Sequence, residues 1–195
     1  MLLMGAAWSL RPAEVDPATP AEAMAWATRQ DHPANMDQCH FNLSDEVTQL
    51  PEATCRSDPS RSPDVVIWGD SHALAWQPLG WEIARVEHGS AVGFTLDACP
   101  PIADYARFRA DFPRHGAKCR RLNELAMGYL ASHRVKTLIM GARWLTSLQS
   151  TDPERVARAA TPRNEGEALA AGLAKALADI SPKVGRIILM APSPQ

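Results

Sequence analysis

The sequence predicts an α/β fold, a three-layer sandwich in which helices cover both faces of a mainly parallel sheet. Short, β-branched apolar runs of the kind that form buried strands alternate with longer stretches of helical periodicity. This alternation occurs four times, and right-handed crossovers between such units produce a parallel sheet. The length of 195 residues is typical of one domain.

The individual elements follow from these patterns. The predicted strands are the apolar runs at 64–68, 91–96, 135–141 and 184–191. The predicted helices, from apolar residues at helical spacing, are 72–87, 118–133 and 165–180. Pro78 lies inside the first of these helices, where a proline causes a kink or an early break.

The chain before the first strand lacks such regularity. Residues 1–63 are predicted to be a linker and an irregular extension with a helix near 21–29, and the α/β domain is predicted to span 64–195. The chain has no stretch of 18 or more apolar residues that could form a complete membrane-spanning helix.

The charge balance excludes one class of partner. Lys and Arg number 20 and Asp and Glu number 22, which gives a formal net charge of −2. Binding to a phosphate backbone requires a basic excess that this composition lacks, so we expect no nucleic-acid partner.

The four cysteines indicate the compartment. Cys39, Cys55, Cys99 and Cys119 include no CxxC pair and no histidine at zinc-finger spacing, which disfavours a structural metal. Of the three possible pairings we favour Cys39 with Cys55 and Cys99 with Cys119, because each pair encloses a loop rich in Pro, Asp, Arg and Ser. Disulfides indicate an extracytoplasmic site such as the periplasm, whereas four reduced thiols would indicate the cytosol.

Ligands of a parallel sheet bind beyond the carboxyl ends of its strands. The candidate binding segments, which follow the first three predicted strands, are therefore 69–72, 97–101 and 141–144. In the first segment, Gly69, Asp70, Ser71 and His72 lie between a buried strand and a helix. A tight turn there can present the Ser71 hydroxyl beside backbone amides that stabilise an oxyanion. The alternative is that Asp70 or Ser71 only caps the helix.

Four strings in order, VVIWGDSHA, ACPP, CRRLN and GARW, resemble the SGNH-type domain attached to bacterial membrane acyltransferases of the acyltransferase-3 kind. The resemblance runs from about Cys39 to Pro194 and implies a flavodoxin-like α/β fold with Ser71 as the nucleophile. It implies that the backbone N–H of Ser71 donates to the oxyanion and that Gly69, Asp70 and His72 line the oxyanion or substrate site.

The same resemblance implies the partners. An acyl group would pass from an acyl donor through Ser71 to a carbohydrate acceptor on the cell surface, such as lipopolysaccharide, or to water. The domain would be periplasmic and tethered to a transmembrane acyltransferase domain, and the chemistry needs no cofactor and no metal.

The sequence departs from the wider SGNH pattern at two oxyanion donors. Where other members carry GxND, this chain reads GARW, so Arg143 could bind an oxyanion or an anionic substrate group, or Arg143 and Trp144 could form a stacked structural pair. Other members take a further oxyanion donor from a glycine after the second strand. The corresponding loop at 97–101 reads DACPP and has no glycine, so the sequence leaves the second oxyanion donor unidentified.

The general base is also missing. The family takes it from a DxxH motif beyond a fifth strand, and the sequence reaches Gln195 just after a fourth, so we expect a chain truncated before that motif. Other histidines are poor candidates for this base. The string DQCH that ends at His40 has the DxxH form but lies upstream of the serine, and His72 adjoins the serine, where neighbouring side chains diverge. His115 is a weak alternative.

Two other functions remain open. A metal-dependent phosphoesterase could use Asp70 and His72, but its further ligand motifs are absent. A glycan-binding or scaffold module that has lost catalysis fits the missing asparagine and the missing DxxH.

Overall fold

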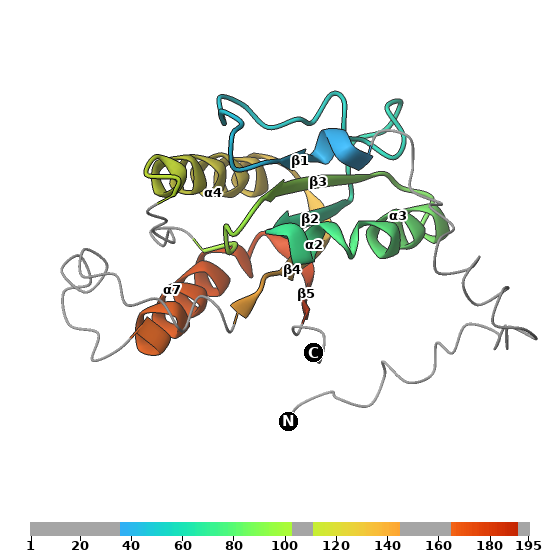
Figure 1. Cartoon of the computed structure of the whole chain (residues 1–195). Helices are drawn as coiled ribbons and strands as arrows, with labels where there is room; N and C mark the ends of the chain where they lie inside the picture. Colours follow the sequence, from blue (N-terminus) through green and yellow to red (C-terminus); the bar gives the residue numbers. More distant parts are fainter. Residues whose placement is uncertain (1–35, 103–110, 145–164, 191–195) are drawn as a thin grey trace, which may run out of the picture. The chain divides into compact units, whose positions relative to one another are not determined.

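The sheet at the centre of the structure is entirely parallel. The computed structural model describes residues 36–102, 111–144 and 165–190. Within these ranges five strands pair in the order β1-β3-β2-β4-β5 (Figure 1). The strands are β1 (His40–Phe41), β2 (Val65–Gly69), β3 (Ala91–Leu96), β4 (Val135–Gly141) and β5 (Val184–Met190). The predicted α/β class with a parallel sheet is confirmed.

The strand register brings the carboxyl ends together at one edge of the sheet. Gly69 of β2 is opposite Thr95 of β3 and Gly141 of β4. The same row continues outward to His40 in β1 and Met190 in β5. The loops that follow β2, β3 and β4 therefore all begin at this edge.

The helices form two outer layers. One face of the sheet is covered by α4 (His115–Ser132) and α7 (Glu165–Ile180), and the other by α2 (Ser71–Leu74) and α3 (Gln77–Val86). In Figure 1, α4 and α7 lie to the left of the strands and α3 lies to the right. A short 3₁₀ helix, η1 (Met36–Cys39), precedes β1.

The single helix predicted over 72–87 is two helices, because the chain breaks before Pro78. Pro78 lies in the first turn of α3, whose N-cap is Trp76. Proline fits this position because the first N–H groups of a helix have no partner within the helix. The break leaves α2 as a separate short helix that contacts β2, β3 and β4.

α4 begins three residues before its predicted start at residue 118. His115 and Lys118 are buried polar residues of the first turn, and both side chains bind backbone carbonyls rather than join the apolar stripe. The helical apolar pattern therefore starts only after the helix has begun. The helix predicted near 21–29 lies outside the described residues.

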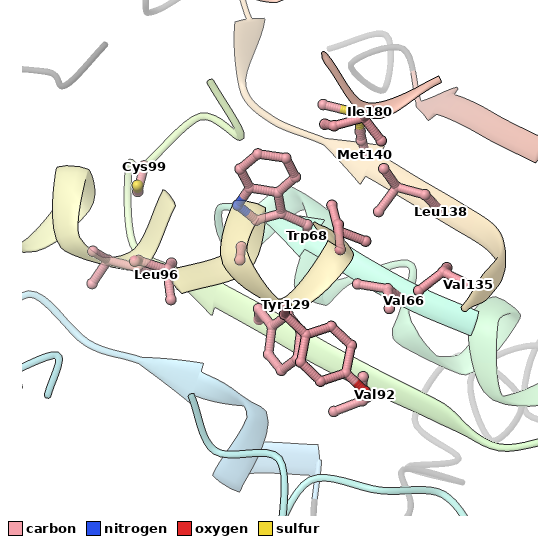
Figure 2. Packing of buried hydrophobic residues seen from close by; sticks show 14 of the residues in the cluster. Val66, Trp68, Val92, Leu96, Cys99, Tyr129, Val135, Leu138, Met140 and Ile180 are labelled. Carbon is pink, nitrogen blue, oxygen red and sulfur yellow. The ribbon is translucent and has the colours of Figure 1, made fainter. Parts of the chain in front are cut away.

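The larger core lies between the sheet and the α4–α7 layer. Figure 2 shows Trp68 at its centre, with Leu96 and Tyr129 nearby and side chains of β4 beyond. Trp68 is fully buried, and its indole N–H donates to Oδ1 of Asn123 in α4 (3.0 Å). The amide of Asn123 donates in turn to the carbonyls of Pro100 and Ile102 (3.0 and 2.7 Å). One buried side chain thus links strand β2, helix α4 and the loop after β3.

Both predicted disulfides are present. Cys39–Cys55 (Cα–Cα 5.0 Å) joins two parts of the extension, and Cys99–Cys119 (Cα–Cα 5.4 Å) joins the loop after β3 to α4. Residues of the extension also enter the sheet itself, since His40 and Phe41 pair with β3. A two-residue strand has too little pattern to be recognised in a sequence.

We expect Asn123→Ala to lower the free energy of unfolding by about 2–4 kcal/mol, because it leaves the indole N–H of Trp68 and two carbonyls unpaired in the core. Urea denaturation under non-reducing conditions measures the change. Glu124→Ala, on the exposed side of the same helix turn, is the matched control and should change it by less than about 0.5 kcal/mol. Equal effects of the two substitutions would contradict the structural role of Asn123.

Candidate active site

The segments after β2 and β4 meet at the carboxyl edge of the sheet because glycines let their backbones approach closely. Gly69 has a φ of +151°, and a Cβ there would lie 1.8 Å from the carbonyl oxygen of Gly141. The N–H of Asp70 donates to that same carbonyl (3.3 Å). A residue with a side chain at position 69 would therefore push the start of α2 away from β4.

The carboxylate of Asp70 ties the two segments together. Oδ1 accepts from the N–H of His72 (2.8 Å), which makes Asp70 the N-cap of α2. Oδ2 accepts from the N–H of Arg143 in the loop after β4 (2.8 Å). Burial raises the pKa of the Asp70 carboxyl, and the hydrogen bonds from Arg143 and His72 offset part of that rise.

Ser71 is an exposed residue of this arrangement. It is the first residue of α2, directly after the buried Asp70. Within the described residues, neither its hydroxyl nor its backbone N–H has a hydrogen-bond partner. Helix capping is performed by Asp70, so the capping interpretation does not account for Ser71.

The other predicted contact residues divide into two groups. The N–H groups of His72 and Arg143 both bind the carboxylate of Asp70, which precedes Ser71, and Arg143 is exposed. Trp144 packs in the cluster of Ile102 and Leu169, and its indole N–H donates to the carbonyl of Met190 (2.9 Å). Trp144 thereby links the loop after β4 to β5. Roles for these residues in binding stay predictions.

The loop after β3 carries a polar cluster that the sequence did not indicate. His40 contacts Thr95 through Nδ1 (3.0 Å) and the carboxylate of Asp97 through Nε2 (3.1 Å). On the other side, Nε2 of the fully buried His115 donates to the carbonyl of Asp97 (2.6 Å). The sequence suggested both histidines only as weak candidates for a base, whereas here their rings hold Asp97. Nothing in the spacing of residues 40, 97 and 115 indicates that they meet.

The described residues give no ligand set for a metal. Among them, no three His, Cys, Asp or Glu side chains are grouped in a way that could hold a metal ion. The phosphoesterase alternative therefore gains no support from this part of the chain. No described helix is long and apolar enough to cross a membrane.

Comparison with protein families gives a match over most of the chain. The model of the SGNH domain that is fused to AT3 domains matches residues 38–195. The chain belongs to this SGNH family. Members of the family occur joined to AT3 domains, the arrangement that the sequence motifs suggested.

Among solved structures, the chain is similar to the periplasmic domain of a lipopolysaccharide acetyltransferase from Salmonella ser. Paratyphi A. The two share 17% sequence identity with a TM-score of 0.45. The alignment covers 69% of this chain and 47% of that one, so this chain spans about half of the length of that domain. No curated protein sequence matches this chain.

The raised pKa of Asp70 predicts a pH dependence of stability. A carboxyl whose pKa is higher in the folded than in the unfolded protein binds its proton more strongly when folded, so its stabilising effect is present at low pH and is lost as the pH rises. The loss begins near the ordinary value of 3.8 and continues through the raised folded value. The free energy of unfolding should fall with rising pH relative to that of Asp70→Asn, which cannot titrate.

Urea denaturation at a series of pH values measures the difference between the two proteins. Asp70→Asn also loses one hydrogen bond, but that loss is a constant offset. Asp179→Asn, at an exposed position of α7, controls for the change in net charge. If the free energy of unfolding of the unsubstituted protein, relative to that of Asp70→Asn, stays constant or rises with pH, burial does not determine the pKa of Asp70.

Proposed function

We propose that this domain is a serine-dependent O-acyltransferase or esterase that adds acetyl or other acyl groups to cell-surface glycans, or removes them. Ser71 is the nucleophile. One observation supports this most directly: Ser71 is an exposed residue at the carboxyl edge of a parallel sheet, its hydroxyl has no partner among the described residues, and the chain is of the SGNH family. The neighbouring Asp70 is buried and already occupied by two backbone N–H groups.

The reaction follows from this placement. The Ser71 Oγ bonds to the carbonyl carbon of the acyl donor, the bond to the leaving group breaks, and the serine proton ends on that leaving group. A sugar hydroxyl or water then bonds to the acyl carbon, the bond to Ser71 Oγ breaks, and the proton of the acceptor returns to Ser71. The N–H of Ser71 itself stabilises the oxyanion in both steps.

The compartment and the tether follow from other observations. Two disulfides close loops in the described structure, and such bonds persist in oxidising compartments, so we place the domain in the periplasm or another extracytoplasmic space. The family description supports a link to a transmembrane acyltransferase domain that delivers the acyl group.

Substitution of Ser71 tests the proposal. In the protein extended through any residues that follow Gln195 in its reading frame, Ser71→Ala should lower the kcat/KM for ester hydrolysis at least about a hundredfold, because the acyl-enzyme route is lost. Hydrolysis of p-nitrophenyl acetate by both proteins gives this ratio.

Ser132→Ala is the matched control, because Ser132 ends α4 just before β4 starts, at the opposite edge of the sheet. It should retain the activity of the unsubstituted protein. Equal activity of Ser71→Ala and Ser132→Ala would reject Ser71 as the nucleophile.

A glycan-binding or scaffold module is the second candidate function. The GARW segment favours it, because an exposed Arg143 stands where other SGNH proteins have an oxyanion-binding asparagine. A downstream DxxH motif in the reading frame would favour the enzyme, whereas glycan binding that survives Ser71→Ala in a protein without turnover would favour the module.

A further inference from the structure

The carboxylate of Asp97 has one oxygen that is held by the protein and one that is not. Nε2 of His40 lies 3.1 Å from Oδ1, and because a carboxylate only accepts hydrogen bonds, Nε2 donates. Oδ2 has no hydrogen-bond partner among the described residues. The side chain of Asp97 is 32% exposed, whereas that of His40 is 11% exposed. Asp97 thus keeps one acceptor oxygen free on a partly exposed side chain.

The backbone of Asp97 is fixed as well. Its N–H donates to the carbonyl of Phe41 in β1 (3.0 Å). Its carbonyl accepts from Nε2 of the fully buried His115 in α4 (2.6 Å). A polar group that is oriented in this way loses little conformational freedom when a ligand binds, which favours affinity. The position of the carboxylate is therefore set by β1 and α4 before a ligand arrives.

The side chain of Asp97 lies on the face of the sheet that α2 covers. The His40 ring contacts both the hydroxyl of Thr95 (3.0 Å) and the carboxylate of Asp97, so these two side chains share a face. Alternate residues of a strand point to the same face, which places Thr95 on the face of Ala91. Ala91 packs in one cluster with Ala73 of α2. The free carboxylate oxygen and α2 are therefore on one face of the sheet.

The strand register brings Asp97 close to the start of α2. Gly69 in β2 is opposite Thr95 in β3. Ser71 and Asp97 each follow this pair by two residues. Helix α2, which begins at Ser71, contacts β3 as well as β2. Neighbouring strands are about 4.8 Å apart, a spacing that suits one sugar in contact with both residues.

The chemistry of the free oxygen favours a neutral hydroxyl as its partner. A carboxylate repels an anionic group such as a phosphate, and it accepts hydrogen bonds but donates none. Both ring nitrogens of His40 are engaged, by Thr95 and by Asp97, so His40 does not take a proton from a ligand. Hydrogen bonds to a charged acceptor are stronger than those between neutral groups. A glycan acceptor offers many hydroxyls that can donate to such an oxygen.

We propose that Oδ2 of Asp97 binds a hydroxyl of the carbohydrate acceptor, adjacent to the hydroxyl that receives the acyl group from Ser71. The inference rests on the proposed function and deepens it, because it names the acceptor class, a neutral sugar with two adjacent free hydroxyls. During transfer the first hydroxyl bonds to the acyl carbon, the bond from that carbon to Ser71 Oγ breaks, and the proton of the first hydroxyl passes to Ser71. The second hydroxyl keeps its proton and donates it in a hydrogen bond to Asp97.

Two small alcohols test this site. Glycerol carries adjacent hydroxyls, as sugars do, whereas propan-1-ol has a chain of the same length and a single hydroxyl. In the protein whose turnover depends on Ser71, with p-nitrophenyl acetate as the donor, acetyl transfer to glycerol should exceed transfer to propan-1-ol at least about tenfold at equal concentrations. The reason is that the second hydroxyl gains a hydrogen bond to a charged group. Gas chromatography of the two esters gives this ratio.

Asp97→Asn changes the hydrogen bonding of the free position alone. The amide oxygen still accepts from His40, and an NH₂ group that donates replaces Oδ2. The ratio of transfer to glycerol over transfer to propan-1-ol should fall at least about fivefold, while the rate of Ser71 acetylation by p-nitrophenyl acetate stays within about twofold. Asp64→Asn is the matched control and should keep both, because Asp64 is a similarly exposed carboxyl (25%) that precedes β2 at the opposite edge of the sheet.

The ratio also separates binding from a structural role. A ratio near one in the unsubstituted protein, or a high ratio that survives Asp97→Asn, overturns the role of Asp97. A purely structural role would lower acetylation and both transfers alike and would leave the ratio unchanged. If near-UV circular dichroism shows that Asp97→Asn does not fold, Asp97→Glu, which keeps the charge but displaces the free oxygen by one methylene, decides by the same ratio.

The two proposals fail in different ways. Acetylation that depends on Ser71, together with an unchanged ratio in Asp97→Asn, overturns the acceptor site at Asp97 and leaves the function standing. Turnover that does not depend on Ser71 overturns the proposed function and, with it, this inference.

Discussion

The buried carboxylate of Asp70 is the interaction on which the geometry of the candidate site depends. Its two oxygens accept from backbone N–H groups on different loops, one that begins α2 and one that follows β4. Both partners are backbone groups, so the bridge fixes the path of the chain whatever side chains follow. Such a carboxylate is costly to bury, and its raised pKa is the sign of that cost. The contact is possible only because Gly69 and Gly141 bring the strands' ends together.

A second set of contacts holds the loop after β3. Asn123 binds its carbonyls, the Cys99–Cys119 disulfide anchors it to α4, and His115 and His40 hold Asp97. Many residues of the sequence strings that carry the family resemblance therefore make contacts that join one element to another. Ser71 differs from them, because its hydroxyl makes no such contact with the described residues.

The parts of the fold that were predictable are those encoded by apolar periodicity. The strands at 91–96 and 135–141 and the helix at 165–180 have the predicted bounds, because burial on one or both faces dictates their residues. Cysteine pairing was predictable from loop composition. β1 was not, since two residues carry no period, and the early start of α4 was hidden by the buried polar residues His115 and Lys118.

The site was predictable only in part, for a related physical reason. Asp70 and Ser71 follow a clear strand within one short string, so their place at the sheet edge could be inferred. The cluster of His40, Asp97 and His115 could not, because these residues lie far apart in the sequence and meet only in the folded chain. Contacts of this kind depend on tertiary structure, which local sequence patterns do not report.

Acylation of one hydroxyl is the event that the proposed chemistry requires. Incubation of the full protein with p-nitrophenyl acetate, followed by an acid quench and peptide mapping by mass spectrometry, would detect it. We predict the mass of one acetyl group on the peptide that contains Ser71, formed as fast as the initial release of p-nitrophenol. Rapid release of p-nitrophenol with acetyl groups found only on other residues, or with the Ser71 peptide unmodified at every time point, would contradict the account.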